Sequence, residues 1–157
     1  MRVQICAIGR IKAGEPERAL IDDYVTRFNR TGRPLGLGPL TETEVDDRKG
    51  GGMAAEADLL ARMVPAGGLL VALDERGAMM TSPDFAAELA RWRDAGRQDV
   101  ALVIGGADGI APALRDRAEV AISLGRMVWP HRLVRVMLAE QLYRAATILG
   151  GGPYHRQ

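Results

Sequence analysis

The stretch Leu102-Val103-Ile104-Gly105-Gly106-Ala107-Asp108-Gly109 decides the fold class of this chain. Its first half belongs to an apolar run over residues 99–104, which has the length and character of a strand buried on both faces of a parallel sheet. Its second half is a glycine turn at the carboxyl end of that strand, where open α/β sheets bind their ligands. The residues alone leave two interpretations of this turn open, a ligand-binding turn and a tight structural turn.

Strands and helices are expected to alternate along the rest of the chain. The further strands are expected at residues 3–8, 35–45 and 69–74, with residues 121–129 forming a strand or an extended loop. The helices are expected from residues 15–17 to the Gly32-Arg33-Pro34 stop, at residues 53–63, from Ser82 as N-cap with Pro83 at the first helical position, at residues 112–119 and at residues 131–149. This order predicts a single α/β domain over residues 1–157, with a mostly parallel sheet flanked by helices.

The composition excludes several classes of protein. Apolar residues make up 47% and charged residues 26% of the chain, which is typical of a globular domain. The formal net charge is only +1, so any contact with nucleic acid is expected to use a local patch. The sequence begins without a secretion signal and contains no run of about 18 apolar residues, so we expect no membrane partner.

The cysteine and histidine content indicates a cytoplasmic protein without a bound metal. Cys6 is the only cysteine, lies in the apolar run at residues 3–8, and is expected to be a buried strand thiol. A single cysteine cannot form an internal disulfide, which fits a reducing cytosol. Two histidines and one cysteine, scattered along the sequence, cannot build a zinc site of the usual kind.

Two other segments are expected to border the glycine turn. The strand at residues 69–74 ends in Leu73-Asp74, and the carboxyl ends of parallel strands can open on the same edge of a sheet. The stretch at residues 123–131 is expected to be extended before Pro130, which also suits the start of a helix. Its free backbone groups are suited to reading an adenine edge, and its apolar walls would be Leu124, Met127 and Trp129. The alternative for these apolar side chains, and for Leu73, is simple core packing.

The final helix, at residues 131–149, has two different faces. The expected inner face is apolar and consists of Leu133, Val134, Met137, Leu138, Leu142, Ala145 and Leu149. The other side carries Arg132, Arg135, Glu140, Tyr143 and Arg144. Mixed charges of this kind are typical of a solvated face, and a dimer contact is the alternative.

Two glycine-rich segments have two interpretations each. The loop at residues 46–52 is either a plain surface loop or a mobile loop that contacts RNA. The segment after Gly150-Gly151-Gly152 is either a flexible terminus or a tail that folds over a site when RNA arrives. In this tail, Tyr154 can stack on a base, His155 can exchange protons near neutral pH, and Arg156 can pair with phosphate.

Four segments in this order resemble the RlmH family. They are the stretch at residues 102–109, Trp129-Pro130-His131-x-Leu133-Val134-Arg135-Val136, Ala139-Glu140-Gln141-Leu142-Tyr143-Arg144-Ala145, and Pro153-Tyr154-His155-Arg156. The likeness also includes Leu73-Asp74-Glu75-x-Gly77 and the helix with Glu88, Leu89 and Trp92. It covers nearly the whole chain, with a looser match before residue 60.

The resemblance implies a homodimeric SPOUT methyltransferase whose α/β fold contains a C-terminal trefoil knot. It also implies methyl transfer from S-adenosylmethionine to N3 of a pseudouridine, at the 1915-type position in helix 69 of 23S ribosomal RNA, on the assembled ribosome. The periodicity of the sequence predicts no knot, and true knots are rare. The knot is therefore an expectation from the resemblance alone.

The resemblance also assigns site residues. Carried over by position, the cofactor site would consist of Leu73, Gly105, Leu124, Gly125, Arg126, Met127, Val128 and Trp129. Tyr154, His155 and Arg156 would bind the substrate and reach the cofactor of the partner subunit. The chemistry of the side chains makes His155 and Arg156 the candidate catalytic residues, with Arg144 as a helper. This chain departs from the family pattern at residues 150–152, at Gln157 and in the acids of the 46–52 loop, which bears on RNA affinity.

Two other functions stay open. A non-enzymatic ribosome-binding factor would keep the same fold without activity. A nucleotide-binding enzyme would use the glycine turn, although the turn lacks the spacing of both the dinucleotide fingerprint and the P-loop. Binding of a nicotinamide cofactor would distinguish this second alternative from a methyltransferase.

Overall fold

The computed structural model describes residues 1–46 and 50–156. The expectation of an RNA-contacting loop at residues 46–52 falls partly outside these residues, and the departure at Gln157 falls outside them altogether. Within the described residues, no helix is both long enough and apolar enough to cross a membrane.

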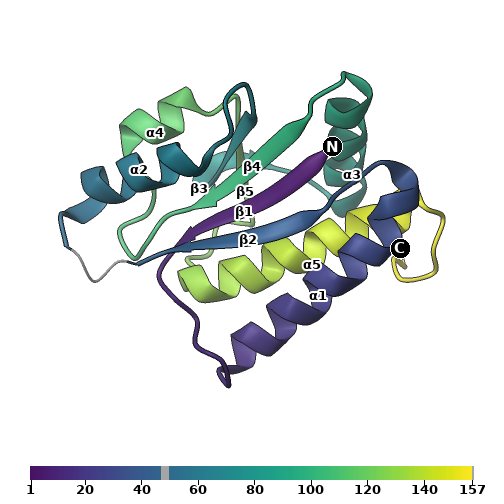
Figure 1. Cartoon of the computed structure of the whole chain (residues 1–157), viewed down its shortest axis with the longest axis horizontal. Coiled ribbons are helices and arrows are strands. Elements are labelled where there is room, and N and C mark those ends of the chain that lie inside the picture. The colour runs from purple at the N-terminus through teal and green to yellow at the C-terminus, as the bar shows by residue number, and fades with distance from the viewer. Residues whose placement is uncertain (47–49, 157) are drawn as a thin grey trace.

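In the described chain, a five-stranded sheet forms the centre of the molecule (Figure 1). Its strands are β1 (Arg2–Ile8), β2 (Leu40–Val45), β3 (Leu69–Met79), β4 (Asp99–Ile104) and β5 (Val120–Ser123). The strand order is β2-β1-β4-β3-β5, and each neighbouring pair is parallel. This sheet confirms the α/β prediction, whereas the trefoil knot stays a prediction.

Helices cover both faces of the sheet. They are α1 (Pro16–Gly32) with the short 3-10 helix η1 (Arg33–Leu35) behind it, α2 (Gly52–Met63), α3 (Ser82–Asp94), α4 (Pro112–Arg117) and α5 (His131–Leu149). Figure 1 shows α2 and α4 above the sheet and α1 and α5 below it. The strands alternate between two apolar clusters, so Ile5 packs with α1, α3 and α5, whereas Cys6 packs with α2 and α4. Cys6 is therefore the buried strand thiol that the sequence predicts.

The register of the sheet brings three strand ends together. Ile104 at the end of β4 pairs with Leu73 of β3 on one side and with Ala7 of β1 on the other. Leu73 in turn pairs with Ile122 of β5. The chain therefore leaves β1, β4 and β5 along one edge, which is where the glycine turn begins.

Several element boundaries differ from the prediction. Strand β2 begins at residue 40 and not at residue 35, because residues 33–35 form the 3-10 helix η1. Strand β3 continues past Asp74 to Met79, because the chain bulges and then pairs with β5 a second time. Gly77 makes this return possible, since a Cβ at this position would lie 2.6 Å from the backbone of Ala121. Helix α4 ends at Arg117, ahead of the expected end at residue 119, because Val120 begins β5.

Helix α5 has the predicted bounds, and Leu138, Leu142 and Ala145 of the predicted inner face are buried, but the face differs at other positions. Arg135, expected on the solvated side, is 0% exposed, and Tyr143 is also buried. Leu133, expected on the inner face, is 40% exposed. Arg135 shares its face with Leu138 and Leu142, three and seven residues further along, so the inner stripe runs through a charged residue.

The N-cap of α3 is Thr81, so the prediction of Ser82 is wrong. The Thr81 hydroxyl accepts a hydrogen bond from the backbone N–H of Asp84 at 3.2 Å, and the Asp84 carboxylate accepts one from the backbone N–H of Thr81 at 3.3 Å. This reciprocal pair is a capping box. Ser82 lies inside the helix, where its hydroxyl donates to the Gln141 amide oxygen of α5 at 2.7 Å.

Replacing Thr81 by alanine should lower the free energy of unfolding by about 1 kcal/mol, because the amide of Asp84 loses its acceptor. Thr81→Ser is the matched control, because it keeps the hydroxyl and should stay close to wild type. Urea unfolding followed by circular dichroism measures both. Equal stabilities for the alanine and serine variants would contradict the assignment of the cap.

Candidate active site

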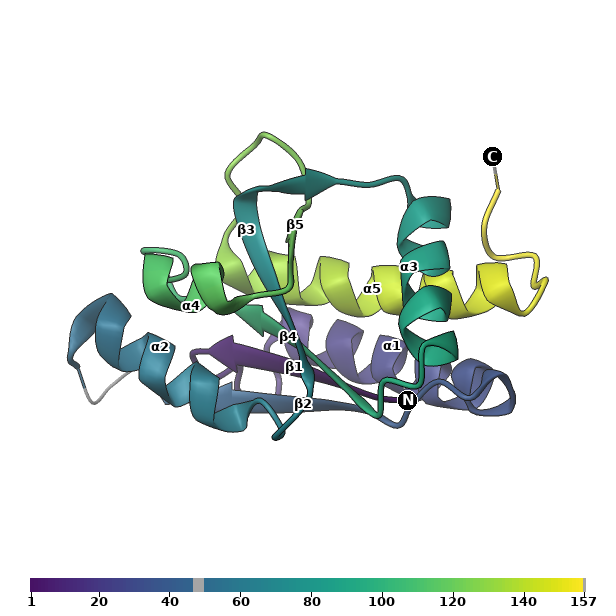
Figure 2. The same ribbon diagram turned by 90° about the horizontal axis from the view of Figure 1, so that it is seen from above.

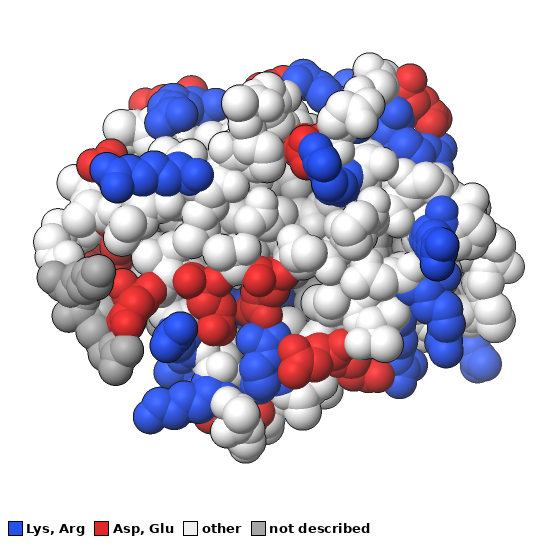
Figure 3. Space-filling view, viewed as in Figure 1, with Lys and Arg blue, Asp and Glu red and all other residues white. Residues whose placement is uncertain are grey.

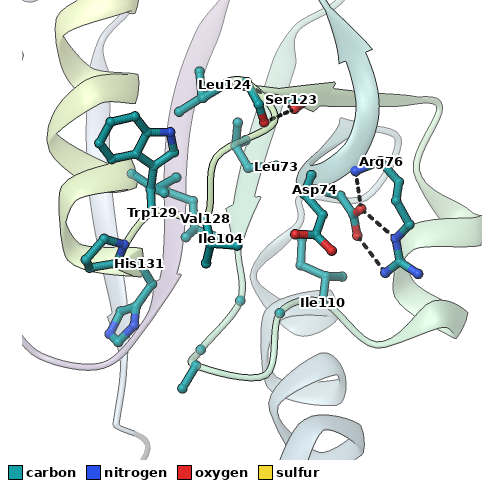
Figure 4. A pocket seen from close by; sticks show the side chains of 18 of the residues that line it. Leu73, Asp74, Arg76, Ile104, Ile110, Ser123, Leu124, Val128, Trp129 and His131 are labelled. Carbon is teal, nitrogen blue, oxygen red and sulfur yellow. Dashed lines mark hydrogen bonds and ion pairs between the residues drawn. The ribbon is translucent and has the colours of Figure 1, made fainter.

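A cavity of about 610 Å³ opens beside the bulge of β3, where β4 and β5 end (Figure 4). That volume lies in the range of small-molecule sites in proteins. The walls come from three segments: residues 73–76 within β3, the glycine turn after β4, and the stretch between β5 and α5. The lining residues include Leu73, Gly105, Leu124, Gly125, Met127, Val128 and Trp129, which are all but one of the residues assigned to the cofactor. Arg126 is the exception and does not line the cavity.

The first glycine of the turn after β4, Gly105, is required by the close approach of the backbone. A Cβ on Gly105 would lie 2.2 Å from the carbonyl oxygen of Gly109, so no side chain fits there without a shift of the backbone. Gly109 has a positive φ of 82° and donates its N–H to the carbonyl of Gly106 at 3.1 Å. The turn is thus tight, and it also lines the cavity, so both interpretations of the sequence describe it correctly.

The stretch between β5 and α5 forms the opposite wall. Its first turn is held by Ser123, whose hydroxyl accepts from the Gly125 N–H at 3.2 Å and donates to the Gly125 carbonyl at 2.9 Å. Residues 126–129 make no hydrogen bonds through their backbone within the described chain, so their N–H and C=O groups are open to a ligand. Met127, Val128 and Trp129 are 71%, 85% and 39% exposed, which excludes the core-packing alternative for Met127 and Trp129.

A buried carboxylate lies across the cavity from Trp129 (Figure 4). Asp74 accepts hydrogen bonds from the backbone N–H of Arg76 at 2.9 Å and from its Nε at 3.1 Å, and the guanidinium of Arg115 lies 3.8 Å away. Burial on its own would raise the pKa of Asp74, but these hydrogen bonds and charges outweigh it and hold the pKa below its ordinary value. Asp74 is therefore an anion held in the cavity wall by hydrogen bonds. The sequence predicts only that it lies at the end of a strand.

The start of α5 is anchored by the buried guanidinium of Arg135. Its Nη1 donates to Glu42 at 3.1 Å and to Glu44 at 2.6 Å, both on β2. Its Nη2 donates to the carbonyls of Ile8 and Gly9, both at 3.0 Å. Because His131 and Val134 of the same helix line the cavity, Arg135 fixes one cavity wall to the ends of β1 and β2.

The C-terminal tail lies at the other end of α5. The Tyr154 hydroxyl donates to the Glu140 carboxylate at 2.9 Å, and its ring contacts Tyr143 at 4.6 Å between centroids. Arg144 lies over the same ring at 4.8 Å and also pairs with Glu140. Figure 2 shows the tail and the cavity stretch at opposite ends of α5. Within one chain, the tail residues and the cavity therefore do not meet.

The protonation of the tail follows from these contacts. Burial, followed by the hydrogen bond to Glu140, raises the pKa of the Tyr154 hydroxyl well above its ordinary value. Arg144 Nη1 lies 3.4 Å from His155 Nδ1. Tyr154 is accordingly a hydrogen-bond donor to Glu140.

Some residues of this region are missed by sequence reasoning. Arg135, Glu42 and Glu44 form the anchor of α5, and the available signals are the position of Arg135 on the leucine face and the alternation of the two acids along β2. Of the further cavity residues, Ile104, Ile122 and His131 lie within the predicted segments and Ile110 directly follows one. Across residues 1–46 and 50–156, no three His, Cys, Asp or Glu side chains gather as metal ligands would.

Comparisons with known proteins agree with this arrangement. A family model described as "Predicted SPOUT methyltransferase" matches residues 1–155. A protein of Cereibacter sphaeroides named "Ribosomal RNA large subunit methyltransferase H" is 69% identical over 156 residues, which cover 99% of both chains. Proteins with the same name from Ruegeria pomeroyi and Dinoroseobacter shibae are 67% and 65% identical over the same length and share.

The fold, the cavity and the match along the chain define a methyltransferase of the SPOUT class. Its relatives are similar over practically their whole length, without large insertions or missing parts. The chain belongs to the RlmH family within that class.

Removing the buried guanidinium should destabilise the fold strongly. We expect Arg135→Ala to lower the free energy of unfolding by about 3–5 kcal/mol, because Glu42, Glu44 and two carbonyls lose their buried partner. Arg132→Ala is the matched control on the same helix turn, where the half-exposed pair with Glu15 should contribute little. Urea unfolding by tryptophan fluorescence measures both, and similar small losses in the two variants would contradict the anchoring role.

Proposed function

We propose that this chain is an S-adenosylmethionine-dependent methyltransferase of large-subunit ribosomal RNA. The proposed target is N3 of a pseudouridine in helix 69 of 23S ribosomal RNA, on the assembled ribosome in the cytoplasm. The observation that carries the proposal is the cavity beside the bulge of β3 and the carboxyl ends of β4 and β5, which is lined by seven of the eight residues assigned to the cofactor. The printed names of the relatives support the class of RNA.

The chemistry of the cavity fits the proposed cofactor. S-adenosylmethionine supplies a methyl group that its sulfonium already activates. Leu73, Ile104 and Ile122 offer apolar surface for an adenine ring, and the open backbone of residues 126–129 offers donors and acceptors for its edge. Asp74 offers a fixed carboxylate to the hydroxyl or ammonium groups of such a ligand. The residues present therefore suit a nucleoside that carries a charged side chain, as S-adenosylmethionine does.

The tail residues have the chemistry that the RNA base requires. A uracil-type N3–H must lose its proton before the nitrogen can accept a methyl group. His155, whose imidazole ring can act as a general base, is proposed to take this proton. Arg156, helped by Arg144, is proposed to stabilise the negative charge that develops on the base. Tyr154 is excluded as the proton acceptor because it holds its own proton, and it is proposed to support the RNA base by stacking.

A homodimer is proposed because one chain cannot join its tail to its own cavity. Helix α5 has 19 residues and separates them by about 28 Å, taken as a rise of about 1.5 Å per residue. The tail that completes a cavity must then come from a partner subunit. Large apolar side chains at and near the cavity mouth are exposed, which supports a partner there: Met79, Met127, Val128, Trp129 and Leu133.

The function is tested by methylation of large ribosomal subunits from a strain that lacks the modification. We expect methylation of assembled subunits, with rates about tenfold or more lower on naked ribosomal RNA, because a nearly neutral protein recognises shape more than general charge. Calorimetry should also show binding of S-adenosylmethionine. Binding to subunits without methyl transfer would favour the non-enzymatic ribosome-binding factor. Binding of a nicotinamide cofactor would favour the nucleotide-binding enzyme, and equal rates on both RNA forms would contradict the preference for the ribosome.

Removal of the two tail groups should separate catalysis from cofactor binding. His155→Ala combined with Arg156→Ala should lower kcat by about 100-fold or more, because it removes the proton acceptor and a cation. Its affinity for S-adenosylmethionine should remain that of the wild type by calorimetry. Full activity of this double variant would rule out the assigned roles.

Mixed dimers provide a control for the origin of the tail. A tail variant mixed with the cavity variant Trp129→Ala should regain part of the activity, because one intact cavity then meets one intact tail. Absence of any recovery, with both variants folded and dimeric, would contradict the completion of the site by the partner subunit.

A further inference from the structure

The connection between β1 and α1, residues 9–15, contacts the start of α5, where His131 and Val134 line the cavity. Strand β1 ends beside β4, since Ala7 pairs with Ile104, whose chain continues into the glycine turn. Arg132, next to the cavity residue His131, donates to Glu15 at 2.7 Å and to the carbonyl of Arg10 at 3.5 Å. Figure 1 shows this connection passing the start of α5.

Among the described residues, two cations on this connection are found in no ion pair. Arg10 and Lys12 are exposed, and neither forms an ion pair with any residue in the described part of the chain. The three acids that contact this region already have guanidinium partners, because Glu15 pairs with Arg132, while Glu42 and Glu44 pair with Arg18 and Arg135. Figure 3 shows basic side chains gathered here, below the acidic side chains of β2. The connection therefore keeps a local positive charge on a nearly neutral protein.

The backbone between these cations is held in place. Arg135 donates to the carbonyls of Ile8 and Gly9, and Glu44 accepts from the N–H of Ile11 at 2.9 Å. Ile11 itself is buried. The two exposed side chains thus extend from a fixed backbone, so less conformational freedom is lost when an anion binds them than on a flexible loop.

We propose that Arg10 and Lys12 form a phosphate-binding surface for the RNA strand that enters the cavity. The inference rests on the proposed function, because it places the backbone of the same ribosomal RNA. Phosphate contacts carry no sequence information but fix the position of a strand, and cations near a cavity can hold the backbone of a strand whose base lies inside it. A local patch of this kind also answers how a chain with a formal net charge of +1 binds RNA.

The test compares two double variants with equal loss of charge. In Arg10→Ala with Lys12→Ala, the KM for large subunits lacking the modification should rise roughly tenfold, with kcat and the affinity for S-adenosylmethionine unchanged. The dependence of log binding constant on log salt concentration should become shallower by about 1.4, which corresponds to two phosphate contacts at about 0.7 each. Charge reversal, Arg10→Glu with Lys12→Glu, should increase the effect on KM.

The control removes two exposed cations that lie near the amino ends of the strands, away from the cavity. Arg62 lies in the last turn of α2 and Arg117 in the last turn of α4, so both precede a strand. Arg62→Ala with Arg117→Ala should leave the KM and the salt dependence at wild-type values. An equal rise of KM in this control would show that total charge matters and would overturn the assignment to the connection.

The outcomes separate this inference from the proposed function. A wild-type protein that neither binds nor methylates subunits overturns both. An active wild type with an unchanged KM and salt slope in the Arg10 and Lys12 double variant overturns only this inference. The same holds if the double variant loses S-adenosylmethionine affinity, because the connection would then act on the cofactor and not on the RNA.

Discussion

Arg135 carries its charge into the interior, where Glu42, Glu44 and the carbonyls of Ile8 and Gly9 surround it. Removing a guanidinium from water is costly unless several acceptors replace the water, and here four acceptors do so. The contact joins three elements that are far apart in the sequence: the end of β1, the acids of β2 and the first turns of α5. One cavity wall leads directly into α5, so the shape of the site depends on this single buried ion cluster.

The sequence predicts the sheet and the cavity well because both depend on local patterns. Residues 99–104 and 131–149 form elements with the predicted bounds, since a buried parallel strand is continuously apolar and proline and glycine mark its neighbours. Parallel strands also open on a common edge, so the pattern of strands is enough to place Leu73, Gly105 and the stretch after Ser123 together. Their role in binding a cofactor stays a prediction.

The parts that sequence reasoning misplaces depend on contacts between distant segments. Arg135 looks like a solvated residue until β2 supplies its two acids, and Leu133 looks buried until the fold leaves its side of α5 open. Strand β3 extends beyond Asp74 only because β5 lies beside it. The resting position of Tyr154 depends on Glu140 and Tyr143, which no periodicity of the tail reveals. In each case the partner, and not the residue itself, decides the outcome.

Helix α5 begins at the cavity and ends at the tail, and it has 19 residues. Its length therefore sets the distance between the cavity and the tail. One inserted residue would move the tail by about 1.5 Å and turn it by about 100° around the axis, which points Tyr154 away from its contacts. Point substitutions on the exposed side of α5 leave this spacing intact, whereas insertions and deletions do not. The helix should therefore tolerate changes of composition far better than any change of length.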